Sequence, residues 1–223
     1  MTTMALAEGR PLSWPAQVWR GTRYALGLAT LSFGIVVTTR AGLGVSPINS
    51  LPFVLSVVTP LSLGTGTLLM HLAQIAAQVA LLRRRTTLKV WLQLANALLF
   101  AQLIDLVNGH LVLQATGYAT GAAILALGIF ATAAGTFLIV GADLVNSPPD
   151  GLVKAIAGQT KAAFGTVKII HDSALVAVTA TIGLAAAHWL VGLGPGTIAA
   201  AFLVGYLTKL FAHLPARYFG RPN

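Results

Sequence analysis

Three ionisable side chains stand together inside an otherwise apolar stretch at 162–187. Lys168, His171 and Asp172 lie one to two helical turns from its start, and the i, i+4 spacing of Lys168 and Asp172 lets them pair on a helix. An ionisable group within a membrane is costly and usually faces a cavity or a partner. This group could therefore carry a proton or hold a polar substrate, or its members could simply satisfy one another.

A second polar set lies at a similar depth in the apolar stretch at 62–82. His71 is followed by Gln74 and Gln78 on the same helix face. An internal repeat, described below, aligns His71 with Asp172. We therefore treat the two stretches as the carriers of one candidate site.

Two Ser-Pro turns precede short amphipathic segments. Proline favours the first turn of a helix because its missing N–H would have no partner there. Each turn is therefore predicted to start a short helix, whose free N–H groups favour an anion, a carbonyl or a water molecule. The side chains in and after these turns are expected to cap the helices or to line a vestibule. They are Ser46, Asn49, Asn146, Ser147 and Asp150. Arg40, just before the first turn, is expected either to attract an anion or to contact lipid head groups.

The composition indicates an integral membrane protein surrounded by the lipid bilayer. The 223 residues are 56% hydrophobic and 9% charged, with a mean hydropathy of +0.81, whereas soluble domains carry about 25% charged residues. The net charge of +9 gathers in the termini and around Arg83–Arg85. This is the positive-inside pattern of a membrane protein and argues against nucleic-acid binding.

Known enzyme motifs are not found in the sequence. There is no cysteine, nucleotide-binding loop, metalloprotease helix or nucleophile elbow. We therefore expect no cofactor and no metal, and an enzyme is the less favoured class.

Six apolar stretches are long enough to span a bilayer, since each span needs about 20 residues. They run near 22–39, 62–82, 88–107, 118–140, 162–187 and 195–213. The stretches 41–61 and 141–161 leave only short helices, predicted at 47–58 and 148–158, that re-enter the membrane or lie at its surface. Charge placement then puts the tails at 1–20 and 215–223 in the cytoplasm.

The chain repeats itself after 101 residues. Glycines, the Ser-Pro turns and a Gly-Thr pair recur without a gap, which divides the chain into repeat 1 (21–110) and repeat 2 (111–214). Three spans per repeat require the copies to have opposite orientations in the membrane. If the short segments also crossed, the copies would be parallel, but Asp150 and Lys154 would then lie in or beside a very short span. The predicted fold is an all-α membrane protein of two inverted three-helix repeats.

Four segments carry a resemblance to a known family. They are Arg40-Ala-Gly-Leu-Gly-Val-Ser-Pro47, Leu63-Gly-Thr65, Asn146-Ser-Pro-Pro-Asp-Gly-Leu152 and Phe164-Gly-Thr166. The chain resembles the YczE/YyaS/YitT-type family of bacterial membrane proteins. The resemblance implies a multi-pass protein of the bacterial plasma (inner) membrane and leaves the biochemical role open. The second copy departs from the glycine-rich turn, with Asp143 and Asn146 at the positions of Gly42 and Val45.

The leading hypothesis is a small secondary transporter or channel-like permease with a site between the two re-entrant elements. Its cargo would be a small polar or anionic solute, proton-coupled through His171 and Asp172. The alternatives are an intramembrane enzyme acting on a lipid head group or lipid phosphate, and a non-catalytic membrane partner of another complex. A second copy of the chain is a candidate partner.

Overall fold

The computed structural model describes residues 14–213 and is all-helical over that range. The eight α-helices are α1 (Trp14–Arg40), α2 (Pro47–Val58), α3 (Leu63–Leu82), α4 (Leu88–His110), α5 (Tyr118–Ala142), α6 (Pro148–Thr160), α7 (Phe164–Ala187) and α8 (Pro195–Ala212). A short 3-10 helix, η1 (Arg83–Arg85), joins α3 to α4. Most of the expected tails lie outside the described residues, but positions 14–20 belong to α1, which therefore begins earlier than predicted.

Five helices in the described part of the chain are long and apolar enough to cross a membrane, which indicates a membrane protein. These are the segments Leu63–Arg85, Leu88–His110, Tyr118–Ala142, Phe164–Ala187 and Pro195–Ala212. Helix α1, with 27 residues, is not among them. It carries Arg20, Arg23 and Arg40, which lower its mean hydropathy.

Helices α1 and α5 are antiparallel and share the most extensive interface among the described helices, with small residues at the crossing. A Cβ atom on Gly34 would collide with Thr132 of α5, and one on Gly135 would collide with Leu31 of α1. The 101-residue repeat relates position 34 to position 135, and position 31 to position 132. It therefore converts each of these two contacts into the other. The same exchange relates the contacts of Gly128 with Thr38 and of Gly27 with Ile139.

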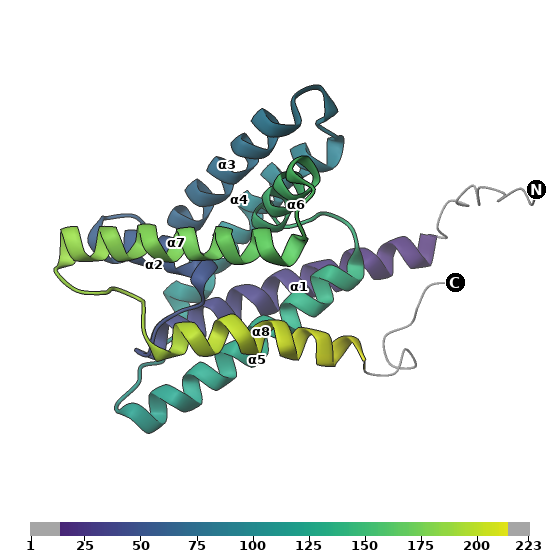
Figure 1. The fold of residues 1–223 in the computed structure, drawn as a ribbon. Coiled ribbons are helices and arrows are strands. Elements are labelled where there is room, and N and C mark those ends of the chain that lie inside the picture. The colour runs from purple at the N-terminus through teal and green to yellow at the C-terminus, as the bar shows by residue number, and fades with distance from the viewer. Residues whose placement is uncertain (1–13, 214–223) are drawn as a thin grey trace, which may run out of the picture.

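The remaining long helices pack outward from this central pair. Helix α4 packs on α1, α8 packs on α5, and α3 packs on α4. Figure 1 shows the α3–α4 pair on one side of α1 and the α5–α8 pair on the other.

Two ends of the bundle are distinguished by their contacts. At the Arg20 end, Arg20 donates to the Ala142 carbonyl at the end of α5 (2.7 Å). At the Arg40 end, Arg40 donates to the side-chain oxygen of Asn108 in α4 (2.9 Å).

Backbone contacts join the two halves at the Arg40 end. The Val45 N–H donates to the Gly192 carbonyl (2.9 Å), and the Gly196 N–H donates to the Leu43 carbonyl (2.8 Å). Gly44, between them, has a φ of +104°, and a Cβ atom there would lie 2.7 Å from the Gly194 nitrogen. The turn before α2 is therefore seated directly on the start of α8.

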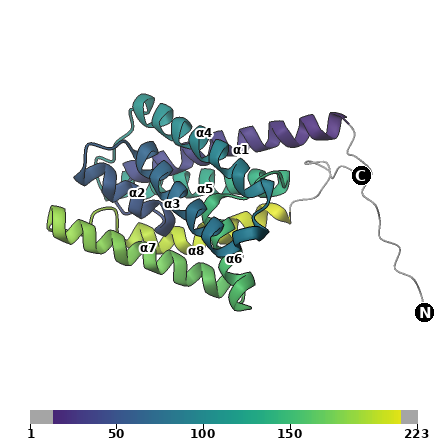
Figure 2. The ribbon, with the colours of Figure 1, turned by 90° about the horizontal axis from the view of Figure 1, so that it is seen from above.

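The two short helices lie near opposite ends and both pack on α3 and α7. Helix α2 has the expected bounds, whereas α6 ends two residues later than predicted. Helix α7 makes its extensive contacts with α2 and α6, and it runs along the edge of the molecule in Figure 2. Only 11% of its apolar window is buried, the lowest share among the five candidate spans.

Candidate functional site

Helix α3 carries a stripe of buried polar side chains. Thr67, His71, Gln74 and Gln78 are each 5% exposed or less. Their spacing of four, three and four residues puts them on one helix face. Since buried polar groups are costly unless they are paired, this face marks a polar interior between helices that are otherwise apolar.

A chain of polar contacts runs from the start of α6 through α7 toward this stripe. The Ser147 hydroxyl donates to Asp150 Oδ2 (2.8 Å). Lys168 Nζ lies 3.6 Å from Asp150 Oδ1 and 3.5 Å from Asp172 Oδ2. Asp172 Oδ1 lies 3.0 Å from His171 Nδ1. The structure therefore places five predicted site residues of the second repeat in one continuous network.

His171 links this network to α3. Its Nε2 atom lies 3.3 Å from Gln74 Nε2. Because the amide nitrogen can only donate, His171 Nε2 accepts and Nδ1 carries the proton that is donated to Asp172. In this arrangement the imidazole is neutral.

Two buried atoms next to this contact have no partner. They are His71 Nδ1 and Gln74 Oε1. The His71 ring is stacked on Phe100 of α4, with ring centroids 5.9 Å apart and planes 9° apart. A buried polar atom without a partner costs about 1–3 kcal/mol. The two atoms are therefore the natural contact points for a water molecule or a polar ligand.

The site lies deep within the helices that hold it. His71 is 11 residues before the end of α3 at Leu82, about 16 Å along the axis. Asp172 is 8 residues after the start of α7 at Phe164, about 12 Å along the axis. Since a bilayer core is about 30 Å thick, both positions correspond to its middle.

A buried amide pair closes the site toward the Arg20 end. Gln78 Nε2 donates to Gln93 Oε1 of α4 (2.9 Å) and to the Pro148 carbonyl of α6 (3.0 Å). Gln93 Nε2 donates back to Gln78 Oε1 (3.2 Å). A Cβ atom on Gly151 would lie 2.5 Å from Gln78 Oε1, so this glycine lets α6 approach the pair.

Ser46 and Ser147 occupy the N-cap positions of α2 and α6, as the Ser-Pro turns predict, but without side-chain capping bonds. Asn49 Nδ2 instead donates to Ser46 Oγ (2.9 Å), and Asp150 accepts from Ser147. At both helix starts the serine hydroxyl is therefore bonded to the side chain three residues later rather than to a backbone N–H of its own helix.

Four predicted site residues lie outside the network. Within residues 14–213, no hydrogen bond or ion pair joins Ser46 or Asn49 to it. Arg40 contacts Asn108 at the opposite end of the bundle. Asn146 is exposed and accepts from Lys154 Nζ (2.7 Å). The starts of the two short helices are thus held in different surroundings.

Comparison with protein families matches residues 18–213, which include nearly all of α1 and every later helix, to a family described as "Family of unknown function (DUF6198)". The chain belongs to this family. No curated protein and no solved structure matches the chain. The resemblance to the YczE/YyaS/YitT-type proteins stays a prediction, because this DUF6198 match does not bear on it.

Sequence reasoning missed three members of the buried polar set in this DUF6198 chain. Gln93 reaches the site from α4, and Ser50 of α2 pairs with Thr179 of α7 through their hydroxyls (2.9 Å). The 101-residue repeat could have predicted the contact between Ser50 and Thr179. Thr179 is Gln78 shifted by 101, and Ser50 shifted by 101 is the position of Gly151. The second long helix of each repeat therefore uses the same repeat position to contact the short helix of the other repeat. In α3 this position is Gln78, which contacts α6, and in α7 it is Thr179, which contacts α2.

The described residues hold no group of three or more His, Asp, Glu or Cys side chains that could bind a metal ion.

Proposed function

We propose that this protein is a small proton-coupled secondary transporter for a small polar solute, with its site among α3, α6 and α7. The observation that carries the proposal is that two buried polar atoms on one face of α3, His71 Nδ1 and Gln74 Oε1, have no partner, while Gln74 also contacts the ionisable network through His171. A binding-competent polar position at mid-depth, connected to protonatable groups, is what coupled transport requires.

The contact between His171 and Gln74 offers a coupling device. A neutral His171 accepts from the Gln74 amide nitrogen. A protonated His171 would carry N–H groups on both ring nitrogens, so it would need the Gln74 amide to turn and present Oε1. Since Oε1 is free in this structure, the turn breaks no existing side-chain hydrogen bond of that oxygen. Protonation and the orientation of a ligand-facing amide are thereby linked.

The charges of the network favour a cationic or neutral solute over an anionic one. Asp150 and Asp172 surround the single ammonium of Lys168, which leaves one excess negative charge. Asp150 also sits in the first turn of α6, where its carboxylate takes the place that an anion would occupy at the helix start. We therefore narrow the expected cargo to a polar cation, a zwitterion or a neutral molecule.

The contact pattern of the helices supports an inverted-repeat architecture with α1 as a sixth span. The glycine contacts between α1 and α5 exchange under the 101-residue shift, and the two helices are antiparallel. Equivalent helices that run in opposite directions are expected of inverted copies. The proposal includes cytoplasmic termini and a bacterial plasma membrane, which rest on charge placement and on the resemblance.

The enzyme alternative receives less support. An enzyme acting on lipid head groups needs its acid–base pair open to the membrane surface. The side chain of His171 is 10% exposed and lies about 10 Å along α7 from the first residue of that helix.

Ligand-induced stabilisation of the purified full chain tests the proposal. Unfolding in neutral detergent would be followed by tryptophan fluorescence with a panel of small amines, zwitterions, neutral polar metabolites and carboxylates. A ligand at a hundredfold excess over its Kd stabilises by about 2.7 kcal/mol. We expect at least one amine, zwitterion or neutral polar metabolite to raise the Tm of the wild-type protein. The same compound should not raise the Tm of Asp172→Asn. The matched control is Asp143→Asn, because the side chain of Asp143 is 89% exposed.

Transport is then measured in proteoliposomes with a trapped pH indicator. Addition of a stabilising compound should move the internal pH with wild-type protein and with Asp143→Asn, but not with Asp172→Asn. The proposal fails if only carboxylates stabilise the protein, if no compound does, or if Asp172→Asn retains every response.

A further inference from the structure

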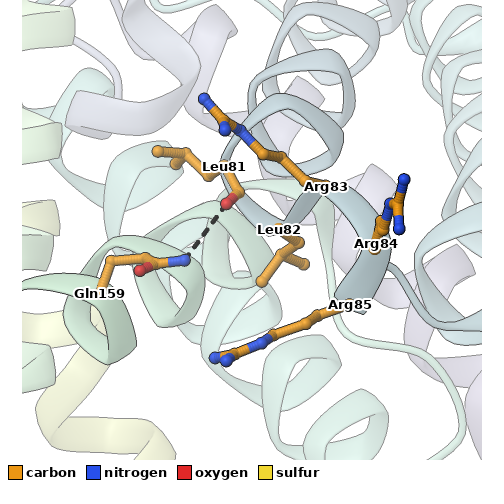
Figure 3. A pocket seen from close by; sticks show the side chains of 6 residues that line it. All are labelled: Leu81, Leu82, Arg83, Arg84, Arg85 and Gln159. Atoms are coloured by element: carbon orange, nitrogen blue, oxygen red, sulfur yellow. Dashed lines mark hydrogen bonds between the residues drawn. The ribbon is translucent and has the colours of Figure 1, made fainter.

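The turn between α3 and α4 holds a cationic hollow that lies outside the polar network. The hollow has a volume of about 450 Å³ and is lined by Leu81, Leu82, Arg83, Arg84, Arg85 and Gln159. Gln159 reaches it from α6 and donates to the Leu81 carbonyl (3.2 Å), which ties the two helix ends together (Figure 3). Two separate segments of the chain therefore build this hollow.

The arginine side chains are arranged unequally around it. Figure 3 shows Arg83 and Arg85 extending on the side of Leu81 and Gln159, whereas Arg84 points away. The backbone at Arg83 has a φ of +49°, a conformation that turns the chain sharply at the end of α3. Both side chains line the hollow, and Figure 3 shows their guanidinium groups on opposite sides of the contact between Leu81 and Gln159.

Among residues 14–213, no acidic side chain pairs with these arginines. The four aspartates of that range have other partners. Asp105 accepts from the Gly64 N–H (2.7 Å) at the far end of α3. The positive charge of the hollow is thus available to an external anion.

The hollow combines this charge with an apolar wall at the membrane boundary. Leu81 is 39% exposed, and the three arginines are the last residues of the candidate span Leu63–Arg85. Guanidinium groups bind phosphate through paired N–H donors. An anion that also carries a hydrocarbon chain would use both halves of the hollow. The positive-inside bias explains the presence of arginines here but not their convergence with Gln159 from α6.

We propose that this hollow binds the phosphate head group of an anionic phospholipid, held by Arg83 and Arg85 with its acyl portion against Leu81. Anionic lipids of the cytoplasmic leaflet are the source of such head groups at a positively charged loop. A free phosphate ion shares the same anionic chemistry but would not use the apolar wall.

The test measures lipid binding to the intact protein by native mass spectrometry. Phosphatidylglycerol is titrated against phosphatidylcholine with wild-type protein, Arg83→Gln/Arg85→Gln and the matched control Arg84→Gln. We expect wild-type protein to prefer phosphatidylglycerol. Loss of the two arginines should weaken that binding by about tenfold or more, since hydrogen bonds to charged groups are the strong ones. Arg84→Gln should bind nearly as wild type does.

Further arms separate the alternatives. Millimolar inorganic phosphate should not displace the lipid, and full displacement would overturn the assignment to a lipid. Equal binding of the two lipids, or equal losses in the double and control variants, would also overturn it. If Arg83→Gln/Arg85→Gln does not fold or inserts wrongly, Arg83→Lys/Arg85→Lys keeps both charges. It must bind phosphatidylglycerol more weakly than Arg84→Lys, and equal binding overturns the proposal.

Discussion

Replacing Gly135 with alanine should weaken the interface between α1 and α5. The added Cβ atom would lie 2.5 Å from the Leu31 nitrogen and 2.7 Å from its Cα atom, whereas ordinary van der Waals contact begins at 3.4 Å. Both obstructing atoms belong to the backbone, so no side-chain rotation relieves the overlap. The two helices must therefore separate by roughly 1 Å at this crossing.

The cost follows from the contacts that this separation removes. A gap of about 0.5–1 Å forfeits roughly a quarter to a half of the attraction between facing atoms, and overpacking of this kind costs about 1–3 kcal/mol. In a chain of this length each kcal/mol corresponds to about 2–4 °C, so Gly135→Ala should have a Tm about 2 °C or more below that of Gly205→Ala, which gains the same helix propensity without the overlap. Gly34→Ala should act similarly, because its Cβ atom would meet the backbone of Thr132.

Tryptophan fluorescence during thermal unfolding in neutral detergent provides the measurement. Gly205→Ala is the control, since a Cβ atom on this glycine of α8 would meet nothing within 4 Å. That variant should match or exceed wild type, because alanine favours a helix over glycine by up to about 1 kcal/mol. A Gly135→Ala protein as stable as the control would refute the close helix approach. The Gly34/Gly135 double variant should lose less than the sum of the single losses, and full additivity would show that the two sites do not share one interface.

Three further substitutions probe the buried polar contacts. Gln78→Leu leaves a glutamine of α4 and a carbonyl of α6 without their partner, so it should cost about 1–3 kcal/mol, seen as a lower Tm; an unchanged Tm would contradict the buried pair. Ser50→Ala removes the hydroxyl contact with Thr179 and should cost about 0.5–1.5 kcal/mol, more than Ser56→Ala, whose hydroxyl bonds only within α2. Lys168→Met removes the ammonium that contacts both Asp150 and Asp172, so its Tm should be lower than that of wild type, because two partly buried carboxylates lose their cation. An unchanged Tm would show that the ammonium does not balance both carboxylates.

Local features of the sequence predicted the parts of the site that depend on local geometry. The Ser-Pro turns located the starts of α2 and α6, because proline at the first helical position acts through its own backbone. The i, i+4 spacing predicted the contact of Lys168 with Asp172, now 3.5 Å. Both inferences depend only on residues that belong to one helix and on the backbone geometry of that helix.

Contacts between distant helices could not be read in the same way. Ser46 and Ser147 occupy equivalent positions of the repeat, yet only Ser147 joins the network, because its neighbour Asp150 reaches a lysine of α7. The equivalent of that lysine in the first repeat is Thr67, which bonds within its own helix. Whether a Ser-Pro turn joins an ionisable network therefore depends on the side chains of another helix, which is α7 for the second turn. The residues of the turn itself do not predict those side chains.

The backbone junction at the Arg40 end has a consequence for sequence drift. Two main-chain hydrogen bonds hold the turn before α2 against the start of α8, and main-chain groups are the same in every amino acid. Gly44 and Gly194 nevertheless have no room for a Cβ atom, which would meet the neighbouring backbone. These two positions must therefore remain glycine if the two hydrogen bonds are to form. Gly196 is confined in the same way, because a Cβ atom there would lie 2.7 Å from the Leu43 carbonyl oxygen. An added methyl group at any of these glycines would push the two halves of the chain apart.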